Sequence, residues 1–272
     1  MGRMPELPEV ETVRRELDPW LTRRTIVRAR RADAPAGPKY AHLERADGQR
    51  IEAVTRRGKF LLLPLSGGDE LVIHLGMTGI VSYTKPAGHL RVVVQLSGKR
   101  KSTLYFRDVR RFGRFLVLPR GDRGLLPSLR QMGPEPLSEA FDAASFHAAL
   151  TSSSAIKTSL LSQRPVAGLG NIYIDEALWR ARIHPLTPAK KISRNKAAQL
   201  RDVIVEVLLA SIAAQGTTIN DYRTVDGQVG AFVEQLDAYG HDGDPCSRCG
   251  RTISKIVVGA RGTHFCPSCQ RR

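Results

Sequence analysis

Acidic residues are scarce in this sequence when compared with basic ones. Asp and Glu number 26 against 42 Lys and Arg in a chain of 272 residues, which leaves a net charge of +16. A chain this basic repels itself unless a polyanion neutralises it. The shortage of negative charge therefore favours nucleic acid as the partner, with anionic membrane and ribosomal RNA as the alternatives.

Long apolar runs are missing as well. No stretch of 18 apolar residues occurs, and the sequence begins without a signal-peptide pattern. We therefore expect a cytoplasmic protein with no membrane partner. We also expect a monomer. Its length suits two domains, or one domain with appendages, and is enough to bury a sizeable core.

The sequence also contains few cysteines. There are four, and all of them lie beyond residue 245. Two C-x2-C pairs, Cys246 with Cys249 and Cys266 with Cys269, are separated by sixteen residues. This spacing is typical of a zinc ribbon, in which four thiolates hold one zinc ion tetrahedrally. Two disulfides are the alternative, but disulfides are rare in intracellular proteins. Four thiolates leave no open position for water, so the expected zinc ion is structural.

The pattern of the first 130 residues changes from helical to β-rich. Residues 5–21 carry apolar side chains at helical spacing, and Pro8 suits a first helical turn. Short β-rich runs separated by Gly-, Pro- and Asp-rich turns follow. They lie at Thr25–Ala29, Arg50–Val54, Phe60–Leu65, Glu70–Leu75, Leu90–Leu96, Ser102–Phe106 and Arg114–Leu118. We therefore expect a β-sandwich or barrel at residues 4–130 that opens with a helix.

The sequence from residue 131 to the cysteines has a helical pattern. Apolar residues recur at three- and four-residue steps in Phe141–Leu150, Ile156–Leu161, Ile172–Ala181 and Arg194–Ala214. We expect an α-helical domain at residues 131–232 and the zinc ribbon at 236–270. The expected fold class is thus α+β and multidomain.

The segment Met4–Thr12, with the sequence MPELPEVET, allows two interpretations. As structure, it is an acidic helix start, in which prolines occupy the first turn and carboxylates interact favourably with the helix dipole. As chemistry, a Pro5 exposed as the N-terminus is a secondary amine that can attack an electrophilic sugar carbon and form an iminium ion. Glu6 beside it can then move the protons that opening of a deoxyribose ring requires.

Seven motifs in order make the sequence resemble one family. They are PELPEVET, RGKFLL at 57–62, HLGMTG at 74–79, DVRRFG at 108–113, GPEPL at 133–137, VAGLGNIY at 166–173, and the cysteine ribbon that contains Arg261. With these motifs the sequence resembles bacterial formamidopyrimidine-DNA glycosylases, which are helix-two-turn-helix glycosylases. The resemblance covers residues 4–269. It implies an N-terminal β-sandwich with a catalytic N-terminal helix, a helix-two-turn-helix domain and a C-terminal zinc ribbon.

The resemblance also implies an activity on double-stranded DNA that contains oxidised bases. Such a DNA glycosylase and AP lyase excises 8-oxoguanine and formamidopyrimidines through a Schiff base on an N-terminal proline, and cleaves the strand by β,δ-elimination. The implied roles are nucleophile for Pro5, general acid/base for Glu6, support of charge and phosphate for Lys59, and a clamp on phosphates for Arg261. A protein with this activity would be associated with the nucleoid.

A set of DNA-binding residues follows from the same resemblance. Its members are His74, Met77, His89, Arg110, Phe112, Lys157, Asn171 and Tyr173. Met77, Arg110 and Phe112 would fill the space that an extruded nucleotide leaves in the base stack, and would contact the orphaned base. The glycine turn before Asn171 would let backbone amides approach a phosphate. Residues 217–230 would form the loop that caps the everted purine.

Some positions depart from the family pattern. Val109 replaces a proline, and Ser152 and His241 stand where basic residues are common. Met1–Arg3 precede the usual start of the family, and Pro5 needs a free amine, so we expect translation from Met4 and removal of that methionine.

Two alternatives to a purine glycosylase stay open. A chain that retains Met1–Arg3 is expected to be a catalytically inactive damage-binding protein. Endonuclease VIII is the sister branch, which shares the fold and the nucleophile but prefers oxidised pyrimidines. The PELPEVET motif, together with Met77, Arg110 and Phe112, favours the purine branch.

Overall fold

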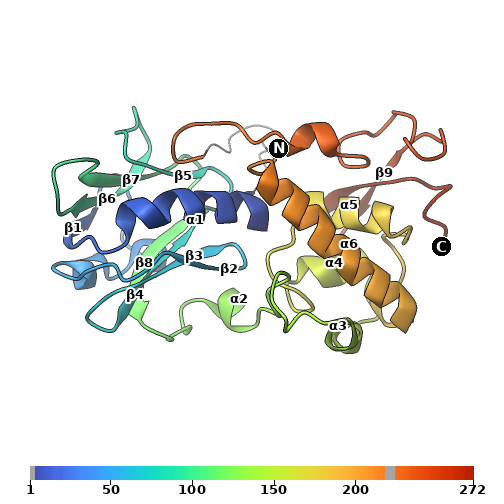
Figure 1. The fold of residues 1–272 in the computed structure, drawn as a ribbon, viewed down its shortest axis with the longest axis horizontal. Helices are drawn as coiled ribbons and strands as arrows, with labels where there is room; N and C mark the ends of the chain where they lie inside the picture. Colours follow the sequence, from blue (N-terminus) through green and yellow to red (C-terminus); the bar gives the residue numbers. More distant parts are fainter. Residues whose placement is uncertain (1–3, 218–223) are drawn as a thin grey trace. The chain divides into compact units, whose positions relative to one another are not determined.

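A computed structural model of the chain describes residues 4–217 and 224–272. It divides into two compact units, the first made of residues up to 130 with 214–231 and the second of 131–213 with 232–272 (Figure 1). Of the helices described, none is both long and apolar enough to span a membrane. The domain boundaries expected from the sequence, 4–130, 131–232 and 236–270, stay a prediction.

The first unit opens with helix α1, Leu7–Leu21, which confirms the helix expected at 5–21. Pro8 lies in its first turn, and Glu6 is its N-cap residue. A capping box joins Glu6 and Glu9, and the Glu9 carboxylate accepts the N–H of Glu6 at 2.8 Å. The box satisfies N–H groups that have no partner inside the helix. The start of α1 is therefore fixed by side chains of its own first turn.

Two four-stranded antiparallel sheets form the body of this unit, in the orders β1-β6-β7-β5 and β2-β3-β4-β8. Their strands are β1 (Ile26–Arg31), β2 (Thr55–Arg57), β3 (Phe60–Pro64), β4 (Asp69–His74), β5 (Gly79–Ser82), β6 (Leu90–Leu96), β7 (Thr103–Asp108) and β8 (Arg114–Pro119). Apolar residues of both sheets share one core with Val10, Val13 and Leu17 of α1. The expected β-sandwich is confirmed.

Two details differ from the sequence prediction. Residues 50–54 form only isolated bridges, Thr25 with Arg50 and Ile51 with Leu65, and continuous pairing begins with β2. Strand β5 is not predicted from the sequence; its four residues follow the turn that contains Gly76. Short helices η1 (Pro38–Tyr40), η2 (Leu43–Ala46) and α2 (Pro127–Arg130) complete the described part of the unit.

The second unit is helical and carries the hairpin of the ribbon. Its elements are α3 (Ala143–Ala149), α4 (Ile156–Leu161), α5 (Asn171–Arg180), η3 (Ala189–Lys191), α6 (Arg194–Ala213), η4 (Phe232–Gln235), β9 (Ser254–Val258) and β10 (Arg261–Phe265). Helix α6 packs on α3 and α5, and α5 packs on β10. Gly259 and Ala260 turn between β9 and β10 with φ of 57° and 59°, as a tight hairpin requires. The four helices expected from apolar spacing are confirmed.

Candidate functional site

The predicted nucleophile and general acid/base lie at the start of α1. Pro5 and Glu6 are both buried. The Glu9 carboxylate reaches two segments at once, because one oxygen accepts the N–H of Glu6 and the other accepts the N–H of Thr217 at 2.7 Å. Gly216 leaves space for this contact, since a Cβ at that position would lie 2.9 Å from the Glu9 carboxylate. Residues 1–3, which decide whether Pro5 has a free amine, lie outside the described residues.

Lys59 and His74 lie next to each other at one end of the β2-β3-β4-β8 sheet. Lys59 is in the β2–β3 turn and is buried. Burial, followed by the charges of Lys59 and Arg114, lowers the pKa of His74 to about 3. His74 is therefore neutral at physiological pH, and its Nδ1 accepts the N–H of Gly76 at 3.1 Å. The neutral ring presents Nε2–H as a donor, which suits a polar contact rather than an ion pair.

Met77 lies in a turn that packs against a second turn at residues 108–113. A Cβ on Gly76 would lie 2.5 Å from the backbone nitrogen of Gly113, so this approach requires glycine. The fully buried Asp108 ties the two turns together, accepting the Thr78 hydroxyl at 2.6 Å and the N–H of Gly113 at 2.7 Å. The Thr78 oxygen in turn accepts the N–H of Arg110 at 3.0 Å. The turn that carries Met77 and the turn that carries Arg110 are thus held in one arrangement.

Arg110 and Phe112 project from this paired turn. Both are exposed, and the Arg110 guanidinium lies 4.8 Å from the centre of the Phe112 ring. The Phe112 side chain is 47% exposed and is suited to stacking against a base. His89 is also exposed, and its carbonyl accepts the N–H of Asp108 at 3.0 Å. Met77, half-buried, completes the set in this unit.

The predicted DNA-binding residues of the second unit differ in their accessibility. Lys157 is fully buried and forms an ion pair with Asp175 at 2.7 Å. Tyr173 is also fully buried, with its hydroxyl 2.6 Å from that of Ser211. Asn171 is half-buried at the start of α5. Neither the Lys157 ammonium nor the Tyr173 hydroxyl faces solvent, so this arrangement favours a positioning role over direct contact with DNA.

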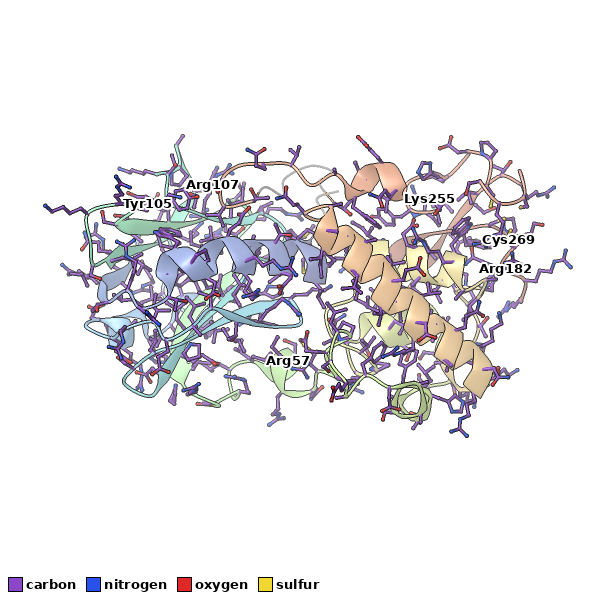
Figure 2. The ribbon with its side chains drawn as sticks, in the orientation of Figure 1. Arg57, Tyr105, Arg107, Arg182, Lys255 and Cys269 are labelled. Atoms are coloured by element: carbon purple, nitrogen blue, oxygen red, sulfur yellow. The ribbon has the colours of Figure 1, made fainter. Side chains whose placement is uncertain are left out.

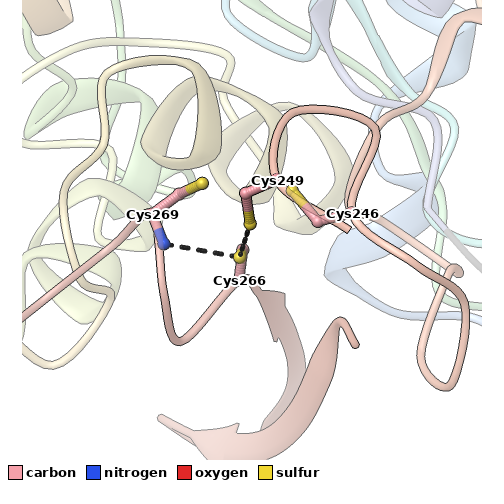
Figure 3. A group of neighbouring side chains, drawn as sticks. All are labelled: Cys246, Cys249, Cys266 and Cys269. Carbon is pink, nitrogen blue, oxygen red and sulfur yellow. Dashed lines mark hydrogen bonds between the residues drawn. The ribbon is translucent and has the colours of Figure 1, made fainter. Parts of the chain in front are cut away.

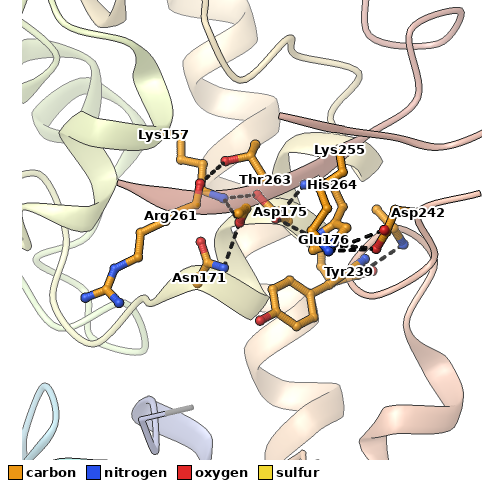
Figure 4. Close-up of polar contacts among 12 residues, drawn as sticks. Lys157, Asn171, Asp175, Glu176, Tyr239, Asp242, Lys255, Arg261, Thr263 and His264 are labelled. Carbon is orange, nitrogen blue, oxygen red and sulfur yellow. Dashed lines mark hydrogen bonds and ion pairs between the residues drawn. The ribbon is translucent and has the colours of Figure 1, made fainter. Parts of the chain in front are cut away.

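Two donors meet at one carbonyl next to Arg261. The Asn171 amide and the Lys157 ammonium both donate to the carbonyl of Gly262, at 2.9 and 3.1 Å (Figure 4). Asp175 accepts the N–H of His264 at 2.9 Å on the same strand. Arg261 itself is exposed, and its side chain extends away from these contacts (Figure 4). Helices α4 and α5 thus fix the backbone of β10 and leave the guanidinium available.

The four cysteines meet at one end of the ribbon (Figure 3). Their sulfur atoms all lie within 4.8 Å of one another, and the sulfurs of Cys249 and Cys266 are 3.5 Å apart. Four sulfurs around zinc at about 2.3 Å stand about 3.8 Å from each other, so the four residues fit one tetrahedral ion. All four are free thiols, which excludes the alternative with two disulfides. The prediction of a single structural zinc ion is confirmed.

The cysteines of this site differ in how readily they form thiolates. The N–H of Arg251, as the main cause, lowers the pKa of Cys249 to about 6. Cys269 has the opposite tendency, since burial raises its pKa to about 12. A metal ion offsets the cost of a buried thiolate because it coordinates the charge directly. The set is therefore a metal site rather than a pair of reactive thiols.

Several positioning residues escape the sequence analysis. Glu9 and Asp108 lie inside recognised motifs, but the motif alone does not say which backbone groups they hold. Asp175 and Glu176 of α5 carry no local signal, although Glu176 accepts the N–H groups of residues 237, 238 and 239 with its buried carboxylate. Burial raises the pKa of Glu176 and the three N–H donors lower it, with burial the larger effect. These contacts span up to 208 residues of chain, which spacing rules do not reach.

Comparison with family models covers nearly the whole chain. Residues 4–115 match the formamidopyrimidine-DNA glycosylase N-terminal domain, 132–223 match the H2TH domain of the same enzymes, and 243–272 match the zinc finger found in FPG and IleRS. The chain belongs to the formamidopyrimidine-DNA glycosylase family. The resemblance inferred from seven motifs is confirmed.

Individual relatives of the family agree over the full length. The formamidopyrimidine-DNA glycosylase of Deinococcus radiodurans is 45% identical over 98% of this chain and 97% of its own. That of Thermus thermophilus is 47% identical over 98% of both chains. The crystal structure of MutM (Fpg) from Thermus thermophilus superposes with a TM-score of 0.90 at 46% identity, over 98% of both chains. A Lactococcus lactis Fpg variant in complex with Fapy-dG-containing DNA gives a TM-score of 0.87 at 36% identity, over 98% of this chain and 100% of its own.

Proposed function

We propose that this chain is a bifunctional DNA glycosylase and AP lyase that excises oxidised purines from duplex DNA and then cleaves the strand. The observation that carries the proposal is Pro5 directly before Glu6, the N-cap of α1, in a family member that matches glycosylases of this name over 98% of its length. We also propose that it acts in the cytoplasm, on nucleoid DNA, as a monomer.

Pro5 and Glu6 divide the chemistry between them. The free amine of Pro5 attacks C1′ and the glycosidic bond breaks, so the base leaves with the bonding electrons. The base takes up one proton and the alkylated Pro5 nitrogen gives one up, which restores the nitrogen lone pair. Glu6 protonates the ring oxygen of the sugar, which opens the ring and leaves an iminium ion between Pro5 and C1′. The iminium acidifies the C2′ proton. Loss of that proton expels the 3′ phosphate, and a second elimination expels the 5′ phosphate.

The remaining site residues bind and shape the DNA. Met77, Arg110 and Phe112 fill the gap that the everted nucleotide leaves in the base stack. The exposed Arg110–Phe112 pair suits this role. Arg261 clamps phosphates with its planar fork of donors. His74, His89 and Lys59 contact the strand near the sugar. Residues 217–230 cap the purine, and of this segment 217 and 224–230 are described.

Lys157, Asn171 and Tyr173 support these contacts from the second unit. The Asn171 amide is half-buried and can contact a phosphate as well as Gly262. Lys157 and Tyr173 act through neighbours, because their polar ends are buried against protein groups. Zinc, when bound, supplies a tetrahedral crosslink that holds the ribbon and performs no chemistry.

Trapping with borohydride tests the proposal. Protein whose first residue is Pro5, verified by mass spectrometry, is incubated with a duplex that carries 8-oxoguanine opposite cytosine and with borohydride. A covalent adduct with DNA is expected, because reduction of the iminium makes the bond permanent. The matched control is the same chain with Met4 retained, which has an amide at Pro5 and should trap nothing. Absence of an adduct from the Pro5-first protein overturns the assignment as an enzyme.

Substrate choice separates the two branches of the family. Excision from duplexes with 8-oxoguanine is compared with excision from duplexes with thymine glycol under single-turnover conditions. Faster release of the purine is expected. A preference for thymine glycol contradicts the purine assignment and leaves the lyase chemistry intact. Mass spectrometry of the native protein that finds Gly2 as its first residue contradicts the expected start at Met4.

A further inference from the structure

Trp179 connects helix α5 to the zinc ribbon. It lies one residue before the end of α5 and is 5% exposed. Its ring belongs to a small buried cluster with Cys246, Cys266, Ile253 and Ala238. A side chain from the helical part of the unit therefore packs directly on two of the zinc ligands.

The polar atom of this side chain, Nε1, is buried and has no hydrogen-bond partner among the described residues. Cys246 packs in the same buried cluster as the indole, so its sulfur is the acceptor that this N–H can take when the site holds a metal. A buried N–H without an acceptor costs about 1–3 kcal/mol. A thiolate on the metal is a good acceptor, so the indole suits the loaded site.

Arg248 covers the other side of the ring. Its guanidinium lies 3.9 Å from the ring centre of Trp179, and it donates to the Trp179 carbonyl at 3.1 Å. A pocket of about 490 Å³ is lined by Arg248 together with Arg182, Arg271, Ser268 and the outer cysteines Cys249 and Cys269. Arg182 and Cys269 are labelled in Figure 2. Four thiolates and one Zn²⁺ carry a net charge of −2, and three arginines next to the outer sulfurs compensate this charge.

We propose that Trp179 and Arg248 are part of the zinc site, where the indole N–H hydrogen-bonds the Cys246 thiolate and the guanidinium compensates the net negative charge of the four thiolates and the metal. Hydrogen-bond partners of metal ligands orient the ligand and raise metal affinity, and their loss costs about 10–100-fold. Trp179 therefore strengthens zinc binding through its N–H, beyond the apolar area that the ring buries.

The substitution Trp179→Phe tests the hydrogen bond, because it keeps an aromatic ring under Arg248 and removes the N–H. Zinc affinity is measured by competition with a chelator of known affinity, with no DNA present. A loss of about tenfold or more is expected. The control is Trp20→Phe, which removes the other of the two tryptophans from the first unit and should leave zinc affinity unchanged. Affinity of the Trp179→Phe protein within about twofold of the parent overturns the proposal.

A spectroscopic measurement keeps the test independent of folding. Cadmium-113 is exchanged for zinc in the Trp20→Phe protein, which leaves Trp179 as the one indole of the chain. A scalar coupling between the metal and the indole Hε1 is expected, because such a coupling passes through an N–H···S bond. Its absence, with Trp179 resolved and the metal bound, overturns the hydrogen bond.

Arg248→Gln probes the charge in the same way. It removes the positive group next to the outer sulfurs and leaves the indole N–H in place. Faster transfer of zinc to the chelator is expected than in the parent, and the effect should shrink as salt screens the charge. An unchanged rate at low salt overturns the part of the proposal that concerns Arg248.

Discussion

The Glu9 carboxylate accepts the N–H of Thr217, 208 residues further along the chain, at 2.7 Å. Its other oxygen accepts the N–H of Glu6, the predicted general acid/base, at 2.8 Å. Glu9 is 2% exposed, so neither N–H can turn to water instead. One buried side chain therefore links the start of α1 with the first residue of the segment proposed to cap the lesion.

The variant Glu9→Gln is expected to slow base excision and cleavage at a preformed abasic site by about tenfold or more each. Glutamine has one oxygen in place of two, so one of the two buried N–H groups loses its acceptor at a cost of about 1–3 kcal/mol, and each 1.4 kcal/mol lost in the transition state is tenfold in rate. Single-turnover rates on 8-oxoguanine DNA and on abasic DNA measure both effects.

Glu16→Gln is the matched comparison, two helical turns away. Glu16 accepts the N–H of Val225 at 2.5 Å, further along the same capping segment. This variant should slow excision and leave abasic cleavage near the parent rate, because an abasic site offers no base to cover. If Glu9→Gln also spares abasic cleavage, Glu6 does not depend on Glu9.

Much of the fold can be predicted from the sequence, because the spacing of apolar residues within a segment indicates which side of a helix or strand is buried. Helix α4 and strand β6 begin and end where apolar spacing places them. β5 is not predicted, since four residues after a glycine turn carry too short an alternating pattern. The spacing of apolar residues does not predict which residues form hydrogen bonds with residues far away in the sequence. The motif containing Asp108 is visible in the sequence, but its bonds to Thr78 and Gly113 appear only when β7 and the two turns fold together.

The candidate site can be predicted only in part, because local sequence patterns do not show contacts between distant residues. The cysteine spacing predicts one zinc ion, which the sulfur positions bear out. In a basic protein the sequence predicts that a lysine such as Lys157 binds a phosphate. In the structure Lys157 is fully buried and forms an ion pair with Asp175. The sequence around residue 157 does not indicate that the carboxylate of Asp175, eighteen residues later, is buried against this lysine. The predicted role of each site residue in binding or catalysis stays a prediction.

Lys157→Met is expected to destabilise the protein by about 3–5 kcal/mol, because it leaves the buried Asp175 charge without its partner. Urea unfolding of the zinc-loaded protein measures this loss. The control is Lys190→Met, which removes an exposed lysine of the same unit and should change stability by less than about 0.5 kcal/mol. Equal stability of the two variants contradicts a buried ion pair.

The salt dependence of DNA affinity distinguishes two roles for Lys157: positioning of Arg261 and direct contact with a phosphate. Arg261→Ala should make the slope of log K against log salt shallower by about 0.9, the value for one phosphate contact. If Lys157 acts through Gly262 and Arg261, adding Lys157→Met to Arg261→Ala changes the slope no further. A second decrease of the same size in the double variant means that Lys157 contacts a phosphate itself.

His74 should make folding stability depend on pH. Its folded pKa of about 3 lies below its ordinary value of 6.5, mainly because of burial. The unfolded chain takes up this proton near pH 6.5 and the folded protein only near pH 3, so stability is lost as pH falls through this window. Unfolding of His74→Asn protein at pH 7.5, 6 and 5 should show a weaker loss than the parent. His89→Asn, at an exposed histidine, is the control, and a parallel loss in all three proteins contradicts the shift.

Thr78→Val tests whether the two turns must be held together for the DNA stack to be filled. The Thr78 hydroxyl donates to Asp108 and accepts the N–H of Arg110, and valine keeps the shape while removing both bonds. We expect Arg110 and Phe112 to lose their fixed position, so that excision opposite cytosine slows by about tenfold while affinity for undamaged DNA stays within about twofold. Ser82→Ala is the control, because the Ser82 hydroxyl donates to the nearby Thr84 carbonyl at 2.8 Å and so makes a local bond outside the paired turns. Discrimination between cytosine and adenine opposite the lesion should narrow in Thr78→Val, because Arg110 reads the orphaned base in the proposed function. Unchanged discrimination together with slower excision would place the effect at the sugar, through the adjacent Met77, rather than at the orphaned base.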